Sequence, residues 1–317
     1  MSLLTVKDLT IDVGEPGTAP IVNNVNFNLA ENEALGIVGE SGSGKTQLVL
    51  SLLRLVPAHF QVGGEVSYQG QDLLQLEPAQ LNPIRANEIA VVFQDAMSAL
   101  NPYLKISTQL TEALVRYKQL TYAQALQRAI EMLERVHISN AAQRIHDYPY
   151  QFSGGMRQRI MIAMALLREP KILIADEPTT ALDVTVQAEL LALIKQLRAD
   201  FNLSLIFITH DMSIVAGQCD RVLVMYAGRV VEQAKIRALF SAPKHPYTQG
   251  LIETARSQSG LVQHLAGIPG QFHHTDRERA GCVFSPRCTQ RLAHCEQEVP
   301  LLLGTPEQQQ ACHLYAK

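Results

Sequence analysis

Eight consecutive residues near the amino terminus have the types and spacing of a phosphate-binding loop. They match the pattern G-x-x-x-x-G-K-[ST] and are Gly39, Glu40, Ser41, Gly42, Ser43, Gly44, Lys45 and Thr46. Glycine permits the backbone turns that point successive N–H groups at phosphate oxygens, and a following helix adds the positive end of its dipole. Lys45 would then reach the β- and γ-phosphates, and the Thr46 hydroxyl would coordinate Mg²⁺. The competing interpretation is a glycine-rich turn with an exposed lysine.

Two adjacent carboxylates follow an apolar run further along the chain. Asp176 and Glu177 come directly after Ile172–Ala175. A strand of this kind delivers polar residues to the carboxyl edge of a sheet, where ligands bind in α/β folds. Asp176 could hold Mg²⁺ through water, and Glu177 could orient and deprotonate an attacking water. The alternative is a solvated acidic turn, but a phosphate-binding loop upstream favours nucleotide hydrolysis.

The elements that must position these residues alternate between strand-like and helix-like patterns. Short β-rich runs predict strands of a largely parallel sheet, and the longer periodic segments between them predict helices. The predicted strands are Ala34–Val38, Glu88–Phe93, Lys171–Ala175 and Leu203–Thr209, the predicted helices are Gln47–Leu55 and Val186–Arg198, and Val222–Met225 with Arg229–Glu232 predict a hairpin.

Between residues 101 and 144 the periodicity is helical throughout, which predicts a helical insertion into the α/β core. Thr121 and Gln124 have the spacing of a capping box. One apolar stripe follows at helical spacing, formed by Tyr122, Leu126, Ile130, Leu133 and Val136.

Composition narrows the class of protein. The chain has 317 residues, 47% hydrophobic and 18% charged, with a net charge of −3, so it can form a sizeable core and shows no electrostatic sign of nucleic-acid binding. No apolar run approaches the roughly 20 residues that span a bilayer. The first residues lack a basic region with an apolar stretch behind it. We therefore expect a cytoplasmic protein that touches a membrane only through partners.

The motifs together resemble those of ABC ATPases. Phe152–Arg159 (FSGGMRQR) is similar to the signature loop of that family, and the other motifs stand around it in the family's order. These are the phosphate-binding loop, Gln94 within VFQD, the Asp176–Glu177 pair, Ala181-Leu182-Asp183 and Thr209-His210-Asp211. The resemblance covers residues 1 to about 240 and implies a nucleotide-binding domain.

The resemblance implies a role for each motif. The signature residues Ser153, Gly154, Gly155 and Gln158 would cap the γ-phosphate that a second subunit holds, because they open a helix whose N–H groups form an anion site. His210 resembles the residue that contacts the γ-phosphate, Gln94 the one that contacts Mg²⁺, and Asp183 the one that couples two sites across a dimer. With one phosphate-binding loop and one signature loop, such a chain must pair with a second ATPase.

One position departs from the family pattern. The family usually stacks adenine on an aromatic residue near the amino terminus, but no Phe, Tyr or Trp precedes Phe27. Val13, Ile21 and Val22 are the apolar candidates for that contact.

The carboxyl-terminal part narrows the resemblance to one branch of importers. His245-Pro246-Tyr247-Thr248-Gln249 resembles a motif of oligopeptide, dipeptide and nickel importer ATPases. With EPTTALDVT (177–185) and VMYAG (224–228), it points to the oligopeptide-permease D-type subunits. The alternative interpretation of His-Pro-Tyr is a loop ordered by proline.

Four of the five cysteines crowd into the last 36 residues, as Cys282, Cys288, Cys295 and Cys312. In a reducing compartment such a cluster favours metal ligation over disulfides. Four thiolates can hold zinc or an iron–sulfur cluster, and the resemblance to peptide importers favours [4Fe–4S]. The alternative is four unligated core cysteines, the role we expect for the isolated Cys219.

We therefore predict an α/β fold of the ABC type of P-loop NTPase, with a β-rich amino-terminal layer. The domain would span residues 1–240, with a helical subdomain at about 97–160, and a loop-rich appendage that carries the four clustered cysteines would span 241–317. The cofactors of the whole protein would be ATP, Mg²⁺ and a [4Fe–4S] cluster, with Zn²⁺ as the alternative to the cluster.

The expected function is ATP hydrolysis that powers peptide import at the cytoplasmic face of a bacterial inner membrane. The expected partners are a second ABC ATPase (a paralogue or another copy), two membrane permeases and, indirectly, an extracytoplasmic peptide-binding protein, with no nucleic acid. The rival interpretations are an importer of nickel or another small solute, a soluble ABC ATPase of DNA repair or translation, and a subunit that binds ATP without hydrolysing it.

Overall fold

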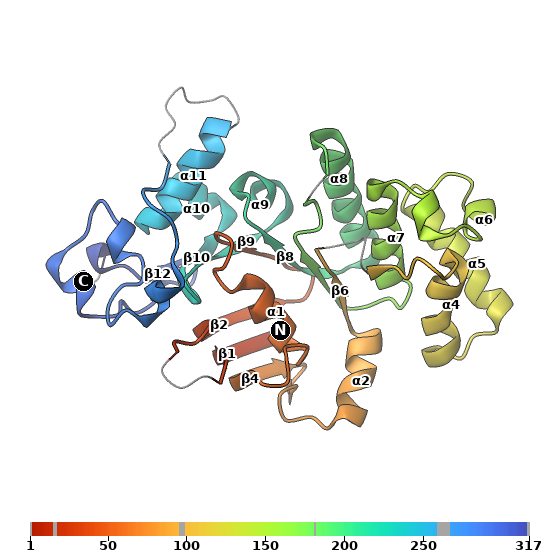
Figure 1. Ribbon diagram of the computed structural model, residues 1–317, viewed down its shortest axis with the longest axis horizontal. Coiled ribbons are helices and arrows are strands. Elements are labelled where there is room, and N and C mark those ends of the chain that lie inside the picture. The colour runs from red at the N-terminus through yellow and green to blue at the C-terminus, as the bar shows by residue number, and fades with distance from the viewer. Residues whose placement is uncertain (1, 15–17, 95–98, 181, 259–266, 316–317) are drawn as a thin grey trace. The chain divides into compact units, whose positions relative to one another are not determined.

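The computed structural model describes residues 2–14, 18–94, 99–180, 182–258 and 267–315 (Figure 1). They form two compact units. The first unit combines Met1–Gln75 with Phe207–Lys317, and the second is Leu76–Ile206. The predicted appendage, residues 241–317, lies in the same unit as the amino-terminal strands. The predicted helical subdomain at 97–160 falls within the second unit.

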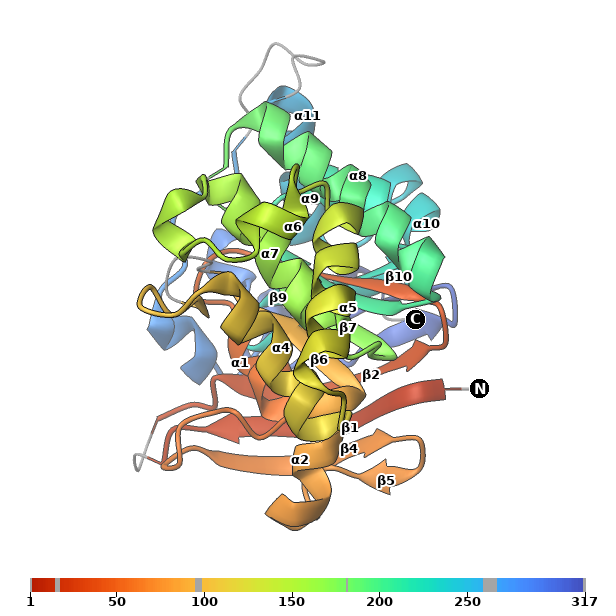
Figure 2. The same cartoon turned by 90° about the vertical axis from the view of Figure 1, so that its right-hand side faces the viewer.

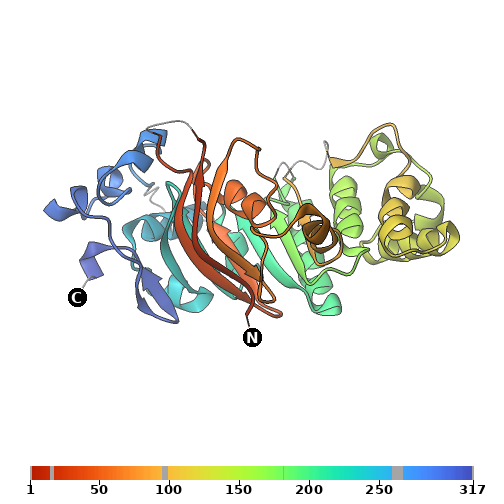
Figure 3. The same cartoon turned by 90° about the horizontal axis from the view of Figure 1, so that it is seen from below.

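An antiparallel sheet forms the β-rich layer of the first unit. Its strands run in the order β2-β1-β4-β5 and appear in red and orange in Figure 3. Their bounds are β1 (Ser2–Asp12), β2 (Val22–Ala30), β4 (Gln61–Tyr68) and β5 (Gln71–Asp72). Val6 of β1 lies opposite Phe27 on β2 and Val66 on β4. All three side chains are buried, so alternating apolar residues fix the register of the sheet.

A second group of strands in the first unit lies beside the phosphate-binding loop. β3 (Ala34–Val38) is buried along its whole length and pairs in parallel with β9 (Arg221–Tyr226). The predicted hairpin is present, since β9 pairs antiparallel with β10 (Arg229–Lys235). Its turn residues Ala227 and Gly228 have positive φ, as a tight right-twisted hairpin turn requires. The predicted helix after the loop is α1, Lys45–Leu52.

The second unit contains the parallel pair that delivers the two carboxylates. β6 (Ile89–Val92) pairs with β7 (Ile172–Asp176), Ile89 lying opposite Ile172. α2 (Pro78–Asn87) precedes β6. α8 (Val184–Phe201) follows β7 and leads into β8 (Ser204–Thr209). The predicted β6, β7, α8 and β8 lie within a few residues of their expected positions, whereas α2 was not predicted.

Helices of the second unit fill the predicted insertion (Figure 2). They are α4 (Ile106–Tyr117), α5 (Tyr122–Arg135), α6 (Ala141–Arg144), the 3₁₀ turn η1 (Pro149–Gln151) and α7 (Gly154–Leu166). The predicted capping box is present, because Thr121 Oγ1 accepts from the Gln124 N–H. The predicted stripe is partly wrong. The predicted Leu133 and Val136 are buried, but Tyr122 is 54% exposed, and Leu126 and Ile130 are only half-buried. Ala125, Ala129 and Met132 complete the buried face of α5.

The carboxyl-terminal region contains more helix than the sequence predicted. α9 (Met212–Gln218) and α10 (Ile236–Ser241) are followed by α11, a 13-residue helix at Pro246–Gln258. The segment predicted as a loop-rich appendage, residues 241–317, therefore contains a regular helix near its start. His245 Nδ1 accepts from the Tyr247 N–H at 3.1 Å, and Pro246 occupies the first helical position. An unusual histidine cap thus begins this helix.

Short turns and strands complete the first unit. The 3₁₀ turns are η2 (His274–Glu278), η3 (Ser285–Arg287), η4 (Ala293–Glu296) and η5 (His313–Tyr315). β12 (Gln308–Gln310) pairs with β10, and β11 (Leu303–Thr305) pairs with β12. Within the parts of the chain that the structure describes, no helix is both long and apolar enough to cross a membrane.

Candidate functional site

The phosphate-binding loop, residues 39–46, joins β3 to α1 and packs closely against neighbouring backbone. A Cβ on Gly39 would lie 2.2 Å from the Met225 carbonyl oxygen, and one on Gly44 would lie 2.8 Å from the Ile21 carbonyl oxygen. Gly44 also has φ of 98°, a conformation that favours glycine. These two glycines are therefore required both by the space available and by the turn that begins α1.

The side chain of Lys45 forms hydrogen bonds with the backbone of its own loop. The side chain is only 5% exposed, and Nζ donates to the carbonyl oxygens of Gly39 at 2.8 Å and Glu40 at 3.0 Å. Thr46 lies half-buried in the first turn of α1, whose N-terminus favours anions. The loop thus places an ammonium, a hydroxyl and a helix N-terminus together, the groups that a triphosphate with Mg²⁺ needs.

In the second unit, β7 ends at the predicted carboxylate pair. Asp176 is 3% exposed, and Glu177 follows with φ of 45°, a strained conformation for a residue with a side chain. Glu177 Oε2 accepts from Gln94 Nε2 at 3.2 Å and from Thr180 Oγ1 at 2.9 Å. The structure therefore brings the predicted Gln94 and Glu177 into direct contact and holds the carboxylate in one orientation.

The signature loop begins α7, as predicted. Ser153 is the N-cap, and its Oγ accepts from the Met156 N–H at 3.4 Å. A Cβ on Gly155 would lie 2.6 Å from Cγ1 of Val186 on α8, whereas one on Gly154 would meet nothing within 4 Å. Gln158 is buried, and its Nε2 donates to the Pro178 carbonyl oxygen. That hydrogen bond joins α7 to the turn after Glu177 and leaves the Gln158 side chain little surface for a second subunit.

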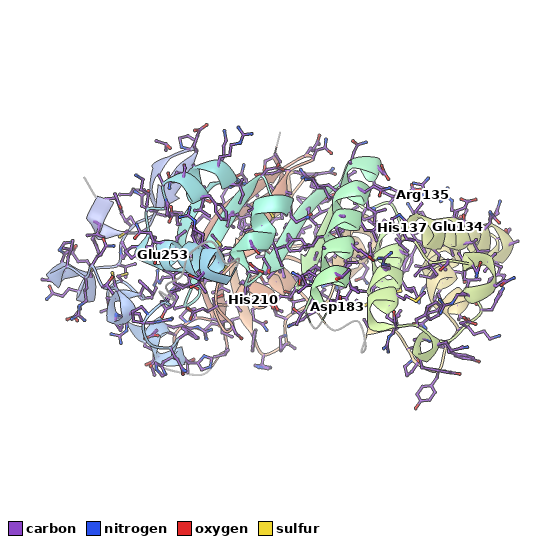
Figure 4. The ribbon with its side chains drawn as sticks, turned by 90° about the horizontal axis from the view of Figure 1, so that it is seen from above. Glu134, Arg135, His137, Asp183, His210 and Glu253 are labelled. Carbon is purple, nitrogen blue, oxygen red and sulfur yellow. The ribbon has the colours of Figure 1, made fainter. Side chains whose placement is uncertain are left out.

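Asp183 and His210 both lie at the ends of secondary-structure elements (Figure 4). Asp183 is the exposed N-cap of α8 and accepts from the Val186 N–H at 3.0 Å, while the next residue, Val184, is 82% exposed. His210 follows β8 and is exposed, and Asp211 caps α9. Ala181 and Asp95, which belong to two of the predicted motifs, lie outside the described residues.

Each unit therefore holds part of the predicted set. The loop residues and His210 belong to the first unit, whereas Gln94, Asp176, Glu177, the signature loop and Asp183 belong to the second. Within the second unit, Gln94 meets Glu177, and Gln158 supports the same turn through Pro178. The sequence did not indicate Thr180 as a partner of Glu177, because a threonine in a turn has no distinctive pattern.

The four clustered cysteines are close enough to influence one another. Burial raises the pKa of the Cys282 thiol to about 11, and Cys295, Cys312 and Cys288 raise it further. Burial also raises the pKa of the Cys288 and Cys312 thiols, and both interact with Cys295. Cys312 interacts with Cys288 as well, so every pair among the four thiols interacts. Yet among the described residues no three His, Cys, Asp or Glu side chains form a group that could hold a metal ion.

The His-Pro-Tyr motif contributes to packing. His245 is 1% exposed, and burial lowers its pKa to about 3, so the imidazole stays neutral. Nearby, Glu232 is completely buried, and its two carboxylate oxygens accept from the N–H groups of Lys244 and His245 and from Gln308 Nε2. These bonds hold the start of α11 against β10 and β12. Cys219 is buried as expected.

Comparison with known families agrees with the predicted resemblance. Residues 22–180 match the family described as ABC transporter, and residues 231–295 match the one described as oligopeptide/dipeptide transporter, C-terminal region. The "Oligopeptide transport ATP-binding protein OppD" of Escherichia coli K12 is 46% identical over 98% of this chain and 93% of its own length. OppD of Haemophilus influenzae is 45% identical over 99% of this chain and 98% of its own.

Comparison with solved structures gives the same fold. The ATP-binding cassette MJ0796, as a dimer in a post-hydrolysis state with ADP and Pi, superposes with a TM-score of 0.65 at 28% identity. The superposed region covers 74% of this chain and 99% of the MJ0796 chain. CbiO1 of Clostridium perfringens, part of the transporter complex cbiONQ, superposes with a TM-score of 0.66 at 26% identity. The superposed region covers 76% of this chain and 91% of the CbiO1 chain. The predicted P-loop fold of the ABC type is confirmed.

We predict that Gly155→Ala destabilises the second unit, because its Cβ would overlap Val186 and push α7 away from α8. The free energy of unfolding should fall by about 1–3 kcal/mol, as is typical of overpacking, in urea titrations followed by helical circular dichroism. Gly154→Ala is the matched control and should be neutral or slightly stabilising, since its Cβ meets open space and alanine favours helix. Adding Val186→Ala should restore most of the loss; equal stability of the two alanine variants would contradict this packing.

Proposed function

The chain belongs to the ABC transporter family, and from that membership we propose that it is the ATP-hydrolysing subunit of an importer for oligopeptides or dipeptides. The observation that supports this most directly is the likeness over nearly the whole chain to proteins named oligopeptide transport ATP-binding proteins. The match to the oligopeptide/dipeptide C-terminal region supports the same class of cargo.

In this proposal each motif acts on ATP and Mg²⁺. The loop residues Gly39 to Thr46 hold the phosphates, and Lys45 exchanges its bonds to loop carbonyls for bonds to the β- and γ-phosphates. Thr46, Gln94 and Asp176 bind Mg²⁺, directly or through water. The metal, when bound, neutralises charge that develops on the phosphates.

Glu177 is the proposed general base. Its carboxylate orients the attacking water and takes up its proton as the water oxygen bonds to the γ-phosphorus. The bond from that phosphorus to the β–γ bridging oxygen breaks in the same step, so that ADP leaves and inorganic phosphate forms. The contacts from Gln94 and Thr180 support this role, because they fix the direction of the carboxylate. His210 is the proposed contact to the γ-phosphate, where it would stabilise negative charge that moves during the reaction.

The complete site is proposed to form only when two ATPase subunits meet. Ser153, Gly154 and Gly155 would present the N-terminus of α7 to the γ-phosphate held by the other subunit, and Asp183 would couple the two sites. The exposure of Ser153, Gly154 and Val184 supports a contact there. The dimeric state of the cassette MJ0796 is the precedent.

The subunit would also bind two membrane permeases at the cytoplasmic face of the inner membrane, and through them serve an extracytoplasmic peptide-binding protein. Large apolar side chains on the helical part of the second unit support a docking surface there. Tyr103 is 87% exposed and Tyr150 is 70% exposed, and aromatic residues are enriched in protein–protein interfaces.

We further propose that Cys282, Cys288, Cys295 and Cys312 hold a [4Fe–4S] cluster. The pairwise interactions among the four thiols support a shared ligand site. Four cysteines are the usual ligand set of such a cluster. The cluster would link η3, η4 and the last strands of the carboxyl-terminal region, which has little apolar core.

Glu177→Gln should reduce steady-state ATP hydrolysis by at least about a hundredfold, the usual effect of removing a general base, while Mg-ATP still binds. Phosphate release and equilibrium nucleotide binding measure the two effects. Glu131→Gln is the matched control, because Glu131 is exposed on α5 and accepts from Gln127. Normal turnover in Glu177→Gln would exclude this residue as the base.

Detergent-solubilised membranes of the native bacterium should yield the chain in complex with two permeases. The measurement is affinity purification of the tagged chain followed by mass spectrometry. Peptide uptake by the cells should fail with Glu177→Gln and proceed with Glu131→Gln. Co-purification with ribosomes or DNA in place of permeases would contradict the transport assignment.

Purification without oxygen should give about four irons and four sulfides per chain, as a [4Fe–4S] cluster requires. Cys288→Ser should lose them, whereas Cys219→Ser, which changes the buried cysteine outside the cluster, should retain them. Elemental analysis and the visible spectrum measure both. One zinc, or no metal, would reject the cluster.

A further inference from the structure

The phosphate-binding loop contains a carboxylate, Glu40, at its second position. A negative side chain beside a triphosphate repels it, and the repulsion is strong where water is partly excluded. The side chain of Glu40 is 28% exposed. The only cation within the loop itself is Lys45, whose ammonium is needed by the phosphates. The charge of Glu40 must therefore be balanced from elsewhere.

Arg287, at the end of η3, supplies that balance within the first unit. Nη1 donates to Glu40 Oε2 at 2.7 Å, and Nη2 donates to Glu40 Oε1 at 3.0 Å. The arginine side chain is only 7% exposed. A two-point bond of this kind fixes the carboxylate in direction as well as in charge.

The guanidinium is fully occupied by protein acceptors. Nε donates to the Pro269 carbonyl oxygen at 2.8 Å, Nη2 also donates to that of Gly270 at 3.2 Å, and Nη1 also reaches the Tyr226 hydroxyl at 3.4 Å. Arginine has five N–H donors, and these contacts with the two to Glu40 engage all of its nitrogen atoms. Arg287 is therefore a positioning residue and has no N–H group directed at a phosphate.

Other residues of the carboxyl-terminal region hold the loop backbone at neighbouring points. The Glu40 N–H donates to the Tyr247 hydroxyl at 2.9 Å, and Arg277 Nη2 donates to the Gly42 carbonyl oxygen at 2.5 Å. Phe272 packs so closely that a Cβ on Gly42 would lie 3.0 Å from its ring. The loop is thus held from outside by residues up to 247 positions away in the sequence.

An aromatic cluster supports these contacts. Tyr226 packs edge-on against Tyr247, Phe272 and Phe284, with ring centroids 4.9, 5.8 and 5.2 Å apart. Burial raises the pKa of Tyr226 to about 12, so its hydroxyl stays protonated and donates to Asp276 at 3.2 Å. Arg287 lies over this cluster, 5.6 Å from the Tyr226 ring centroid.

We propose that Arg287 is the counter-ion of the Glu40 carboxylate, and that the carboxyl-terminal region through this pair sets the affinity of the phosphate-binding loop for ATP. The inference rests on the proposed function of the loop. Without Arg287, Glu40 would face the phosphates with an uncompensated charge. Loss of Arg287 alone should therefore weaken ATP binding, and removal of the charges of Arg287 and Glu40 together should restore it.

The test is equilibrium binding of Mg-ATP to the full chain in the Glu177→Gln background, where hydrolysis does not disturb the titration. Arg287→Met should weaken binding roughly tenfold, and Glu40→Gln added to it should recover most of that loss. Arg287→Lys should lie between, because a lysine keeps the charge and loses the two-point geometry. The deficit should shrink at high salt and be smaller for ADP than for ATP.

Lys235→Met is the matched control. It breaks an exposed ion pair between β10 and Glu307, so it also removes a contact to the carboxyl-terminal region, and ATP affinity should be unchanged. Thermal unfolding of every variant separates folding from binding. If Arg287→Met does not fold, Arg287→Lys with and without Glu40→Gln gives the same comparison.

Two results would overturn the inference. One is unaltered ATP affinity in Arg287→Met, and the other is a double variant as weak as Arg287→Met alone, which would mean a purely structural role. Failure of the proposed function is distinguishable, because the Glu177→Gln parent would then bind no ATP at all, with or without Lys45→Ala.

Discussion

The shape of the phosphate-binding loop is the constraint on which the first unit depends. A loop that turns its N–H groups toward a ligand cannot use them to hold itself, so neighbouring groups must hold it from the other side. Lys45 bonds to loop carbonyls, and the Gly228 N–H donates to the Ser43 carbonyl oxygen at 3.0 Å. The hydroxyl of Tyr247 engages the Glu40 N–H. The hairpin β9–β10, the helix α11 and the loop therefore form one bonded assembly.

In the second unit, neighbouring groups likewise hold the carboxylate of Glu177 in place. The positive φ of Glu177 costs conformational energy, so the surrounding bonds must determine it. Thr180 and Gln94 hold the side chain, and the Thr180 N–H donates to the Glu177 carbonyl oxygen at 3.1 Å. Gln158 holds the next residue, Pro178. A change in the signature helix α7 would thus reach the proposed base through one side chain.

Local patterns in the sequence were sufficient to predict β3, β7, α8, the capping box at Thr121 and the phosphate-binding loop, because each depends on neighbours in the chain. The buried face of α5 was displaced from its prediction, since small residues such as Ala125 and Ala129 pack there instead of the larger Tyr122. α11 was missed because a histidine side chain caps it. The pair Arg287–Glu40 could not be predicted, because nothing local distinguishes a counter-ion from a solvated arginine.

A buried ion pair is weak evidence for stability, because removing two charges from water costs about as much as their attraction returns. Apolar residues of similar size could fill the space between Arg287 and Glu40 with less risk, yet the arginine is supported there by two carbonyl groups and an aromatic cluster. This arrangement is better explained by the geometry and charge of the loop than by the stability of the fold. Arg287 directly precedes Cys288 in the chain, so the residue that balances the charge of Glu40 lies next to one of the cysteines proposed to hold the cluster.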